Sequence, residues 1–399
     1  MSSVLQDVIQ DAAKNYIPHA AILELTRICN LSCRHCYAPP DKARQELSYE
    51  ELCGVVDDLR SMGTLFVTFS GGDPTVNRRY LDIMRYTSDQ RMCVQFFSNG
   101  LLIDERAADE LAEMNVFHVG ISLYGARAET HDDITTRKGS FQKTVRAAKL
   151  LRDRGIYVCF KFIAMNRNAG DAFEAAKMAE DLGIPIRVDT NITARNDLNK
   201  DTLGLRSSLD QHKRILREFQ EGLLQEKNLD RKTGSDLWCV MGKTLISINA
   251  YGDVYPCVTL PVSAGNLRDR PLPEIWSQGA FFQEVRELPS LEKMHGCPEC
   301  ELRPWCNRCP GNTYTETGDL YGPSPAACKE AMLVKQAVNE KQGIHEEIPL
   351  PPGLQGHGRS GWTPGELVEF SGAGCGASCG SRSSLRSMAD GSTFLGLPG

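Results

Sequence analysis

Three cysteines lie within eight residues of one another near the start of the chain. Cys29, Cys33 and Cys36 have the spacing CxxxCxxC and follow residues 21–26, an apolar run that predicts a short buried strand. Loops at the carboxyl ends of barrel strands are where α/β barrels build active sites. Three thiolates suit a soft metal ion or an iron–sulfur cluster. A four-iron cluster on three cysteines keeps one iron open for a small molecule, whereas a zinc site would lack one ligand.

Composition and charge limit the classes of protein to consider. The chain has 399 residues and a net charge of −6, which allows two domains and gives no basic field for nucleic acid. No apolar run is long enough to span a bilayer, and the N-terminus lacks the features of a signal peptide. We therefore expect a cytoplasmic protein with neither nucleic acid nor membrane as partner. In that compartment, fifteen cysteines indicate metal sites more than disulfides.

Alternating strand and helix patterns predict an α/β fold. The expected strands are 21–26, 65–69, 93–97, 116–121, 156–163 and 184–190. The expected helices are 48–61, 78–89, 104–114, 140–154, 170–182 and 207–224, and Ser48 with Glu51 has the pattern of a capping box. Six such units require a parallel sheet covered by helices. An open (β/α)6 barrel and a doubly wound sheet both fit this order of elements.

Small and polar residues follow the predicted strands. Ser70-Gly71-Gly72-Asp73-Pro74 comes after the second strand, where two glycines let the backbone approach a ligand closely. Ser98-Asn99 follows the third strand, Ser122 follows the fourth, and Arg187 lies on the sixth. A plain turn, helix caps and a surface ion pair are the alternatives for these residues.

A second set of cysteines begins after a polar stretch. Its members are Cys239, Cys257, Cys297, Cys300, Cys306, Cys309 and Cys328. Two CxxC pairs are also a zinc signature, although five residues between them are few for a zinc ribbon.

Together these motifs resemble those of the radical SAM enzymes that carry a C-terminal SPASM domain. His35 stands at the aromatic position of the family's CxφC pattern, and Asp73 replaces the glutamate of its usual GGEP. The resemblance implies a partial (β/α)6 TIM-like barrel followed by a small cysteine-rich iron–sulfur domain. It also implies that Cys29, Cys33 and Cys36 hold a [4Fe-4S] cluster that binds S-adenosyl-L-methionine and generates a 5′-deoxyadenosyl radical. The implied cofactor-binding residues are Gly71, Gly72, Asp73, Pro74, Ser98, Asn99, Ser122 and Arg187.

The same resemblance implies one or two auxiliary [4Fe-4S] clusters. One would be held by Cys297, Cys300, Cys306 and Cys328, and the other by Cys239, Cys257 and Cys309. The chain departs from the family pattern in two ways. The spacing from Cys306 to Cys309 is one residue shorter than usual, and no further cysteine near Cys239 offers a fourth ligand.

The motifs divide the chain into five predicted segments. These are a lead-in (1–20), the radical SAM core (21–225), a linker (226–238), the SPASM domain (239–340) and a tail (341–399). Gly, Pro and Ser make up about half of the last fifty residues, so we expect disorder there. Cys375 and Cys379 in this tail suggest either a substrate-like segment modified by its own enzyme or a simple flexible extension.

The resemblance implies an enzyme that oxidises or crosslinks a peptide or protein, as in ribosomal peptide maturation. One alternative is a radical SAM enzyme that alters tetrapyrrole side chains in heme-type cofactor biosynthesis, and another is a non-catalytic iron–sulfur or zinc scaffold. Only 28 residues precede Cys29, so we expect a separate leader-recognition protein or direct leader binding by the barrel. An external electron donor such as flavodoxin or ferredoxin is implied. No catalytic acid or base is assigned.

Overall fold

The computed structural model describes residues 2–38, 44–219, 239–287, 294–346, 348, 349 and 351, with side chains from residue 7 onward. The predicted linker (226–238) and the two cysteines of the tail, Cys375 and Cys379, lie outside the described residues. The chain forms two compact units. The first contains residues 1–162, 173–187 and 240–286, and the second contains residues 163–172, 188–239 and 287–399. The five segment boundaries stay predictions.

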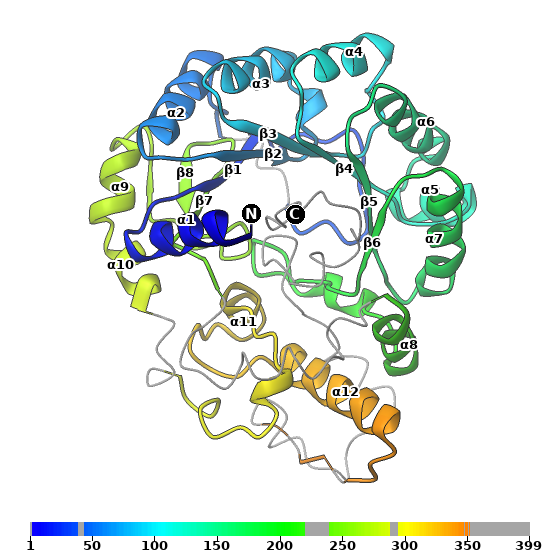
Figure 1. Ribbon diagram of the computed structural model, residues 1–399. Helices are drawn as coiled ribbons and strands as arrows, with labels where there is room; N and C mark the ends of the chain where they lie inside the picture. The colour runs from blue at the N-terminus through cyan, green and yellow to red at the C-terminus, as the bar shows by residue number, and fades with distance from the viewer. Residues whose placement is uncertain are drawn as a thin grey trace. The chain divides into compact units, whose positions relative to one another are not determined.

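One sheet of nine strands organises the described residues, in the order β6-β5-β4-β3-β2-β1-β7-β8-β9 (Figure 1). Its first six strands are β1 (Ala20–Thr26), β2 (Phe66–Gly71), β3 (Cys93–Ser98), β4 (His118–Ser122), β5 (Val158–Ile163) and β6 (Ile186–Asp189). Neighbouring strands from β1 to β5 are parallel. All six predicted strands are present with ends shifted by one or two residues, and the predicted partial barrel is confirmed.

Helices alternate with these strands. They are α2 (Tyr49–Ser61), α3 (Tyr80–Asp89), α4 (Glu105–Glu113), α5 (Ala128–Thr135), α6 (Ser140–Asp153) and α7 (Ala172–Asp181). Figure 1 shows α2, α3, α4, α6 and α7 on the outer side of the curved sheet. The capping box is confirmed, because Ser48 Oγ accepts from Glu51 N and the Glu51 carboxylate accepts from Ser48 N. The sequence pattern does not predict α5, which is only eight residues long.

The barrel strands have one apolar and one polar face. Phe69 and Phe96 are paired in register and fully buried, and full burial of such a side chain stabilises by roughly 1.5–3 kcal/mol. Successive side chains point to opposite faces, so the register also aligns Thr68, Gln95 and His118 in one row across β2, β3 and β4. The apolar face suits the covering helices, which leaves this polar row on the inner side, where a ligand would bind.

Three short strands from the C-terminal half extend the sheet: β7 (Leu245–Ile248), β8 (Asp253–Tyr255) and β9 (Gly265–Asn266). β7 pairs in parallel with β1, so β1 lies between β2 and β7. Their two to four residues are too short to show a readable alternation. Three helices complete this unit, namely α1 (Ser2–Lys14), α9 (Leu272–Gln278) and α10 (Ala280–Glu287). Trp276 Nε1 donates to the Tyr16 carbonyl at 2.7 Å, which ties α9 to the end of α1.

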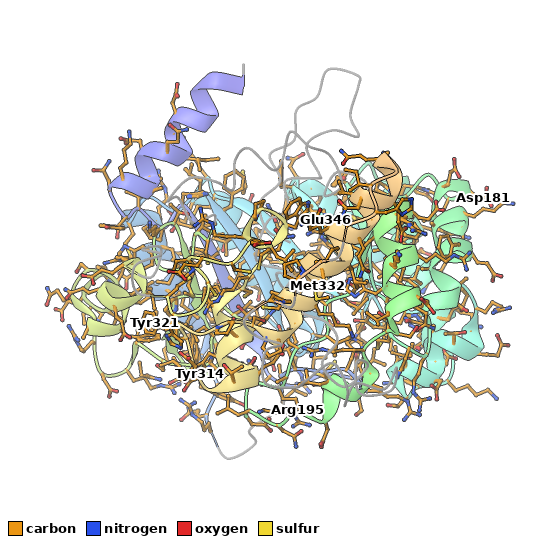
Figure 2. The ribbon with its side chains drawn as sticks, turned by 90° about the horizontal axis from the view of Figure 1, so that it is seen from below. Asp181, Arg195, Tyr314, Tyr321, Met332 and Glu346 are labelled. Carbon is orange, nitrogen blue, oxygen red and sulfur yellow. The ribbon has the colours of Figure 1, made fainter. Side chains whose placement is uncertain are left out.

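The second unit is mainly helical. Its helices are α8 (Leu209–Phe219), α11 (Pro310–Thr317) and α12 (Pro325–Gln342). Leu216 on α8 packs with Leu333, Val334, Ala337 and Val338 of α12. Met332 packs against a second apolar cluster of Leu302, Ala331 and Ile348 (Figure 2).

Short 3-10 helices lie at Pro74–Val76 (η1), Ala169–Asp171 (η2), Asp201–Leu205 (η3) and Arg303–Trp305 (η8). None of the described helices has the length and apolar composition to span a bilayer.

A buried ion pair joins two segments of the second unit. Arg206 Nη2 lies 2.6 Å from Glu316 Oε1, and the two side chains are only 1% and 7% exposed. Arg206 also donates to the Ile192 carbonyl at 3.0 Å. The pair therefore links the segment after β6 to α11.

We expect Arg206→Leu to lower the free energy of unfolding by about 3–5 kcal/mol, because it leaves Glu316 buried without its partner. Urea unfolding followed by circular dichroism measures this. Arg106→Ala is the control, since the Arg106 side chain is 75% exposed in its pair with Glu110, and it should cost less than about 1 kcal/mol. Equal stability of Arg206→Leu and the wild type would contradict the prediction.

Candidate active site

The cysteine loop, residues 29–36, follows β1 and is fastened to α5. Arg34 N donates to the Ile134 carbonyl at 3.0 Å, and Ser32 N donates to the Thr135 carbonyl at 3.4 Å. The Arg34 guanidinium pairs with Asp133, 99 residues further along the chain, at 2.8 Å. The helix that the sequence pattern does not predict therefore fixes the backbone of the predicted metal-binding loop.

The thiols of this loop are close enough to change one another's pKa. Burial raises the pKa of Cys33, and the neighbouring Cys36 and Cys29 raise it further. Burial likewise raises the pKa of Cys29, to which Asp73 and Cys36 add. Bound iron would displace these protons, since coordinating thiols are deprotonated. Three soft donors from one loop, close enough to repel as thiolates, fit the three protein ligands of a four-iron cluster.

The glycine loop is pressed against the chain that leads into the cysteines. A Cβ on Gly71 would lie 2.1 Å from the Thr26 carbonyl oxygen, and one on Gly72 would lie 2.3 Å from the Ile28 oxygen. Gly71 also has φ +129°, a region that side chains disfavour. Gly72 N donates to Thr26 O at 2.7 Å. These glycines thus allow β2 to approach the end of β1, in addition to any approach to a ligand.

Asp73 connects the glycine loop with the loop after β3. Its carboxylate accepts hydrogen bonds from Asn99 N (2.7 Å), Ser98 Oγ (3.0 Å), Thr75 N (3.0 Å) and Thr75 Oγ1 (2.5 Å). The side chain is only 1% exposed. Burial raises the pKa of Asp73, while these hydrogen bonds oppose the increase. Three predicted cofactor-binding residues, Asp73, Ser98 and Asn99, therefore form one hydrogen-bonded group.

The two other predicted strand-end residues lie elsewhere on the sheet. Ser122 ends β4, pairs in register with Lys161 of β5, and hydrogen-bonds the Tyr124 phenol. Arg187 lies on β6, and its charge reaches His118 at the start of β4. Burial is the main cause that lowers the pKa of His118 to about 3, and the charges of Lys161 and Arg187 add to it. His118 is thus neutral near pH 7, and Arg187 is one of the two cations that act on it.

Tyr124 and two histidines stack beside the cysteine loop. The rings of His35 and Tyr124 meet edge-to-face at 4.5 Å, and Tyr124 stacks on His131 at 5.8 Å. His131 Nδ1 accepts a hydrogen bond from Tyr124 N at 3.1 Å. Burial lowers the pKa of both histidines to about 4. Tyr124 is not among the predicted site residues, although it follows Ser122 by two residues at the end of a strand.

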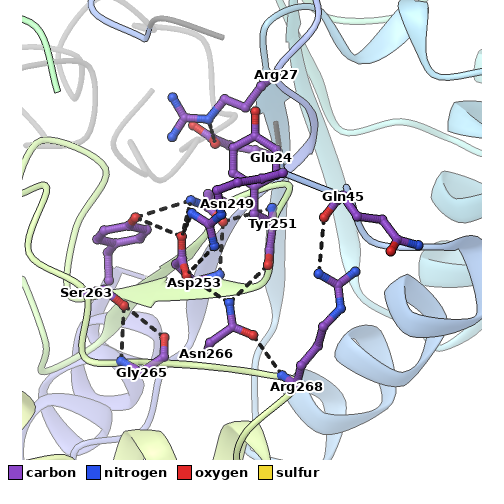
Figure 3. A network of polar contacts seen from close by, with 12 residues as sticks. Glu24, Arg27, Gln45, Asn249, Tyr251, Asp253, Ser263, Gly265, Asn266 and Arg268 are labelled. Atoms are coloured by element: carbon purple, nitrogen blue, oxygen red, sulfur yellow. Dashed lines mark hydrogen bonds and ion pairs between the residues drawn. The ribbon is translucent and has the colours of Figure 1, made fainter. Parts of the chain in front are cut away.

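A buried ion pair also lies just before the cysteines. Arg27 Nε is 2.6 Å from Glu24 Oε2, and the two side chains are 9% and 2% exposed (Figure 3). Among the described residues, the two terminal amino groups of Arg27 have no hydrogen-bond partner. Tyr37 interacts electrostatically with Arg27 and with Cys36. The sequence pattern does not predict this pair, whose only signal is a charge inside an otherwise apolar strand.

The second set of cysteines is divided between the compact units. Cys257 belongs to the first unit, is 3% exposed and follows β8. Cys297, Cys300, Cys306, Cys309, Cys328 and Cys239 belong to the second. There, Cys300 N donates to the Cys297 carbonyl at 3.2 Å, and Cys309 precedes α11. Among the described residues, no three His, Cys, Asp or Glu side chains converge as they would around a single metal ion, and this holds for the loop of residues 29–36 as well as for the second set. The ligand role of Cys29, Cys33 and Cys36 stays a prediction. The auxiliary ligand sets stay predictions.

A parallel barrel with a three-cysteine loop after its first strand and a glycine loop after its second defines a class of iron–sulfur enzymes. Comparison with family profiles agrees with this class. The radical SAM superfamily profile matches residues 23–179, and the SPASM iron–sulfur cluster-binding domain profile matches residues 239–310. Together they cover more than half of the chain. The chain belongs to the radical SAM superfamily and carries an SPASM domain, so it is an enzyme whose cofactors are S-adenosylmethionine, its [4Fe-4S] cluster and auxiliary clusters.

Several characterised proteins are similar along most of their length. An AdoMet-dependent heme synthase of Methanosarcina barkeri is 27% identical, over 77% of this chain and 95% of its own. The mycofactocin maturase MftC of Mycobacterium tuberculosis is also 27% identical, over 82% of this chain and 90% of its own. The crystal structure of Streptococcus suis SuiB bound to precursor peptide SuiA has a TM-score of 0.62 at 15% identity, covering 80% of this chain and 79% of that one. This last likeness concerns the fold.

We expect Gly71→Ala to prevent assembly of the site, because the added Cβ would collide with the Thr26 carbonyl. The measurements are the melting temperature and the iron bound per chain after anaerobic reconstitution. Gly54→Ala is the matched control, since nothing lies within 4 Å of a Cβ at this helical position. If Gly71→Ala kept both wild-type values, the close contact between β1 and the glycine loop would not be required.

Proposed function

We propose that this radical SAM enzyme modifies a peptide or protein substrate, by oxidation or crosslinking, in the maturation of a ribosomally made peptide. The observation that carries this proposal is the similarity to mycofactocin maturase, which extends over both the barrel and the cysteine-rich region. When bound, the cluster and S-adenosylmethionine supply a 5′-deoxyadenosyl radical that abstracts hydrogen. The protein would act in the cytoplasm with an external electron donor and, for a leader peptide, a separate recognition protein.

Most of the predicted site residues have a part in this proposal. Cys29, Cys33 and Cys36 hold the catalytic cluster, and the glycine loop of residues 71–74 borders the cofactor. Ser122 on β4 and Arg187 on β6 would line the inner face of the sheet, on strands away from the glycine loop. The auxiliary clusters use the cysteines assigned above by resemblance, Cys297, Cys300, Cys306 and Cys328 for one, and Cys239, Cys257 and Cys309 for the other.

Arg27 is suited to bind a carboxylate of the substrate. A guanidinium has five donors in a planar fork, and here only the Nε edge is used, by Glu24. The terminal amino groups are not among the fully buried atoms of Arg27, so they are open to a ligand, and a carboxylate matches the planar fork in shape and charge. A peptide offers such a group at an acidic side chain or at its C-terminus.

A tetrapyrrole is the second candidate substrate. The heme synthase of Methanosarcina barkeri is similar over 95% of its own length. Tetrapyrrole side chains also carry carboxylates, so Arg27 suits this substrate class equally. The two candidates differ in what the enzyme binds, and binding therefore separates them.

The deciding experiment uses the full chain, reconstituted and reduced without oxygen. Synthetic peptides encoded by short reading frames beside the gene are tested against iron coproporphyrin III. A peptide that loses hydrogen atoms by mass spectrometry, in step with 5′-deoxyadenosine formation, supports peptide maturation. A shifted porphyrin absorbance band with turnover of the porphyrin, and unchanged peptides, would overturn it in favour of the second candidate.

We expect Cys33→Ala to abolish 5′-deoxyadenosine formation and to lower iron by about four per chain, because one four-iron cluster is lost. Iron analysis and chromatography of the reaction products measure both. Cys53→Ala is the matched control, since Cys53 lies on α2 outside the cysteine sets, and it should change neither value. Zinc in place of iron, with no deoxyadenosine from the wild type, would favour the scaffold instead.

A further inference from the structure

The side-chain amide of Asn99 has a fixed orientation. Its Oδ1 accepts a hydrogen bond from Leu101 N at 3.0 Å. A backbone N–H can only donate, so the oxygen of the amide must face Leu101 and the NH2 group must face the other way. The hydrogen-bond network therefore decides this orientation, which is otherwise ambiguous for asparagine.

The NH2 group of Asn99 faces the first cysteine of the loop. Nδ2 lies 2.6 Å from Asn30 Oδ1 and 3.8 Å from Cys29 Sγ. An amide nitrogen carries two hydrogens, so it can serve both acceptors. Leu31 N also approaches Cys29 Sγ, at 3.4 Å. The sulfur thus receives one donor from its own loop and one from the loop after β3.

The backbone of Asn99 is held from both sides. Asn99 N donates to the buried Asp73 carboxylate at 2.7 Å, and Thr144 Oγ1 donates to the Asn99 carbonyl at 2.7 Å. Asn99 itself is 7% exposed. The amide therefore has little freedom to turn toward another ligand, and Asp73 is one of the groups that hold it in place.

We infer that Asn99 is a positioning residue whose amide donates an N–H···S hydrogen bond to the Cys29 thiolate and so raises the reduction potential of the cluster, with Asp73 as its anchor. The inference rests on the proposed role of Cys29 as a cluster ligand. Hydrogen bonds to ligand sulfurs stabilise the additional electron of the reduced cluster, which is one way that proteins set its potential. The resemblance alone predicts a different role for Asn99, a direct contact with S-adenosylmethionine.

The test is a redox titration of the reconstituted full chain followed by electron paramagnetic resonance. The catalytic cluster is recognised as the signal that shifts when S-adenosylmethionine is added. Asn99→Leu should move its potential to a more negative value while binding of S-adenosylmethionine is retained. Asp73→Asn should shift it in the same direction, because it loosens the anchor. Asn249→Leu is the matched control, since that buried amide also has its oxygen and nitrogen paired, with Tyr251, Asp253 and Tyr255 as partners.

Two results would overturn the inference. One is an unchanged potential in Asn99→Leu, and the other is loss of S-adenosylmethionine binding at an unchanged potential, as a direct cofactor contact would give. If Asn99→Leu does not fold, Asn99→Ser must show the same negative shift. Failure of the proposed function would look different from failure of this inference. If the wild-type protein gave no signal that responds to S-adenosylmethionine, the catalytic cluster itself would be absent.

Discussion

Two backbone hydrogen bonds between the end of β1 and the glycine loop set the geometry of this site. Gly72 N donates to the Thr26 carbonyl and Asp73 N donates to the Ile28 carbonyl, at 2.7 and 3.1 Å. Only residues without a Cβ permit this approach, which explains both glycines. The contact places the Asp73 carboxylate within hydrogen-bonding distance of the loop after β3, and Asn99 of that loop lies next to Cys29. The position of each ligand-facing group thus depends on one tight crossing of two chain segments.

The charges near the cysteines are neutralised by neighbours rather than by water. The Asp73 carboxylate is buried and satisfied by four donors, whereas Glu24 is buried and paired with Arg27. A buried charge without such partners costs several kcal/mol. The nearby imidazoles of His35 and His131 are neutral at pH 7, because burial lowers their pKa to about 4. Within the part of the chain that the structure describes, the field at the cysteine loop is therefore set by fixed hydrogen bonds and ion pairs, not by these histidines.

The sequence predicts the barrel well because its strands and helices have strong periodic patterns and clear end signals. It places Cys29, Asp73 and Asn99 at neighbouring strand ends, and the structure brings Asp73 and Asn99 together. It does not predict α5, which holds the cysteine loop, since eight mostly polar residues show little periodicity. It also misses β7, because a four-residue strand has no distinctive pattern and its partner lies far away in the sequence. Asp73's inward orientation depends on contacts with Ser98 and Thr75 that a motif cannot show.

The place of β1 in the sheet has a consequence for biosynthesis. β1 lies between β2 and β7, yet β7 begins at Leu245, more than two hundred residues after the cysteine loop. At about 5–20 residues per second, a ribosome needs roughly 10–40 s to make the intervening chain. During that interval one edge of the first strand has no partner, and unpaired edges invite association with other chains. The loop that takes up iron is thus made long before its strand is enclosed, so delivery of the metal and protection of the nascent chain fall in the same period.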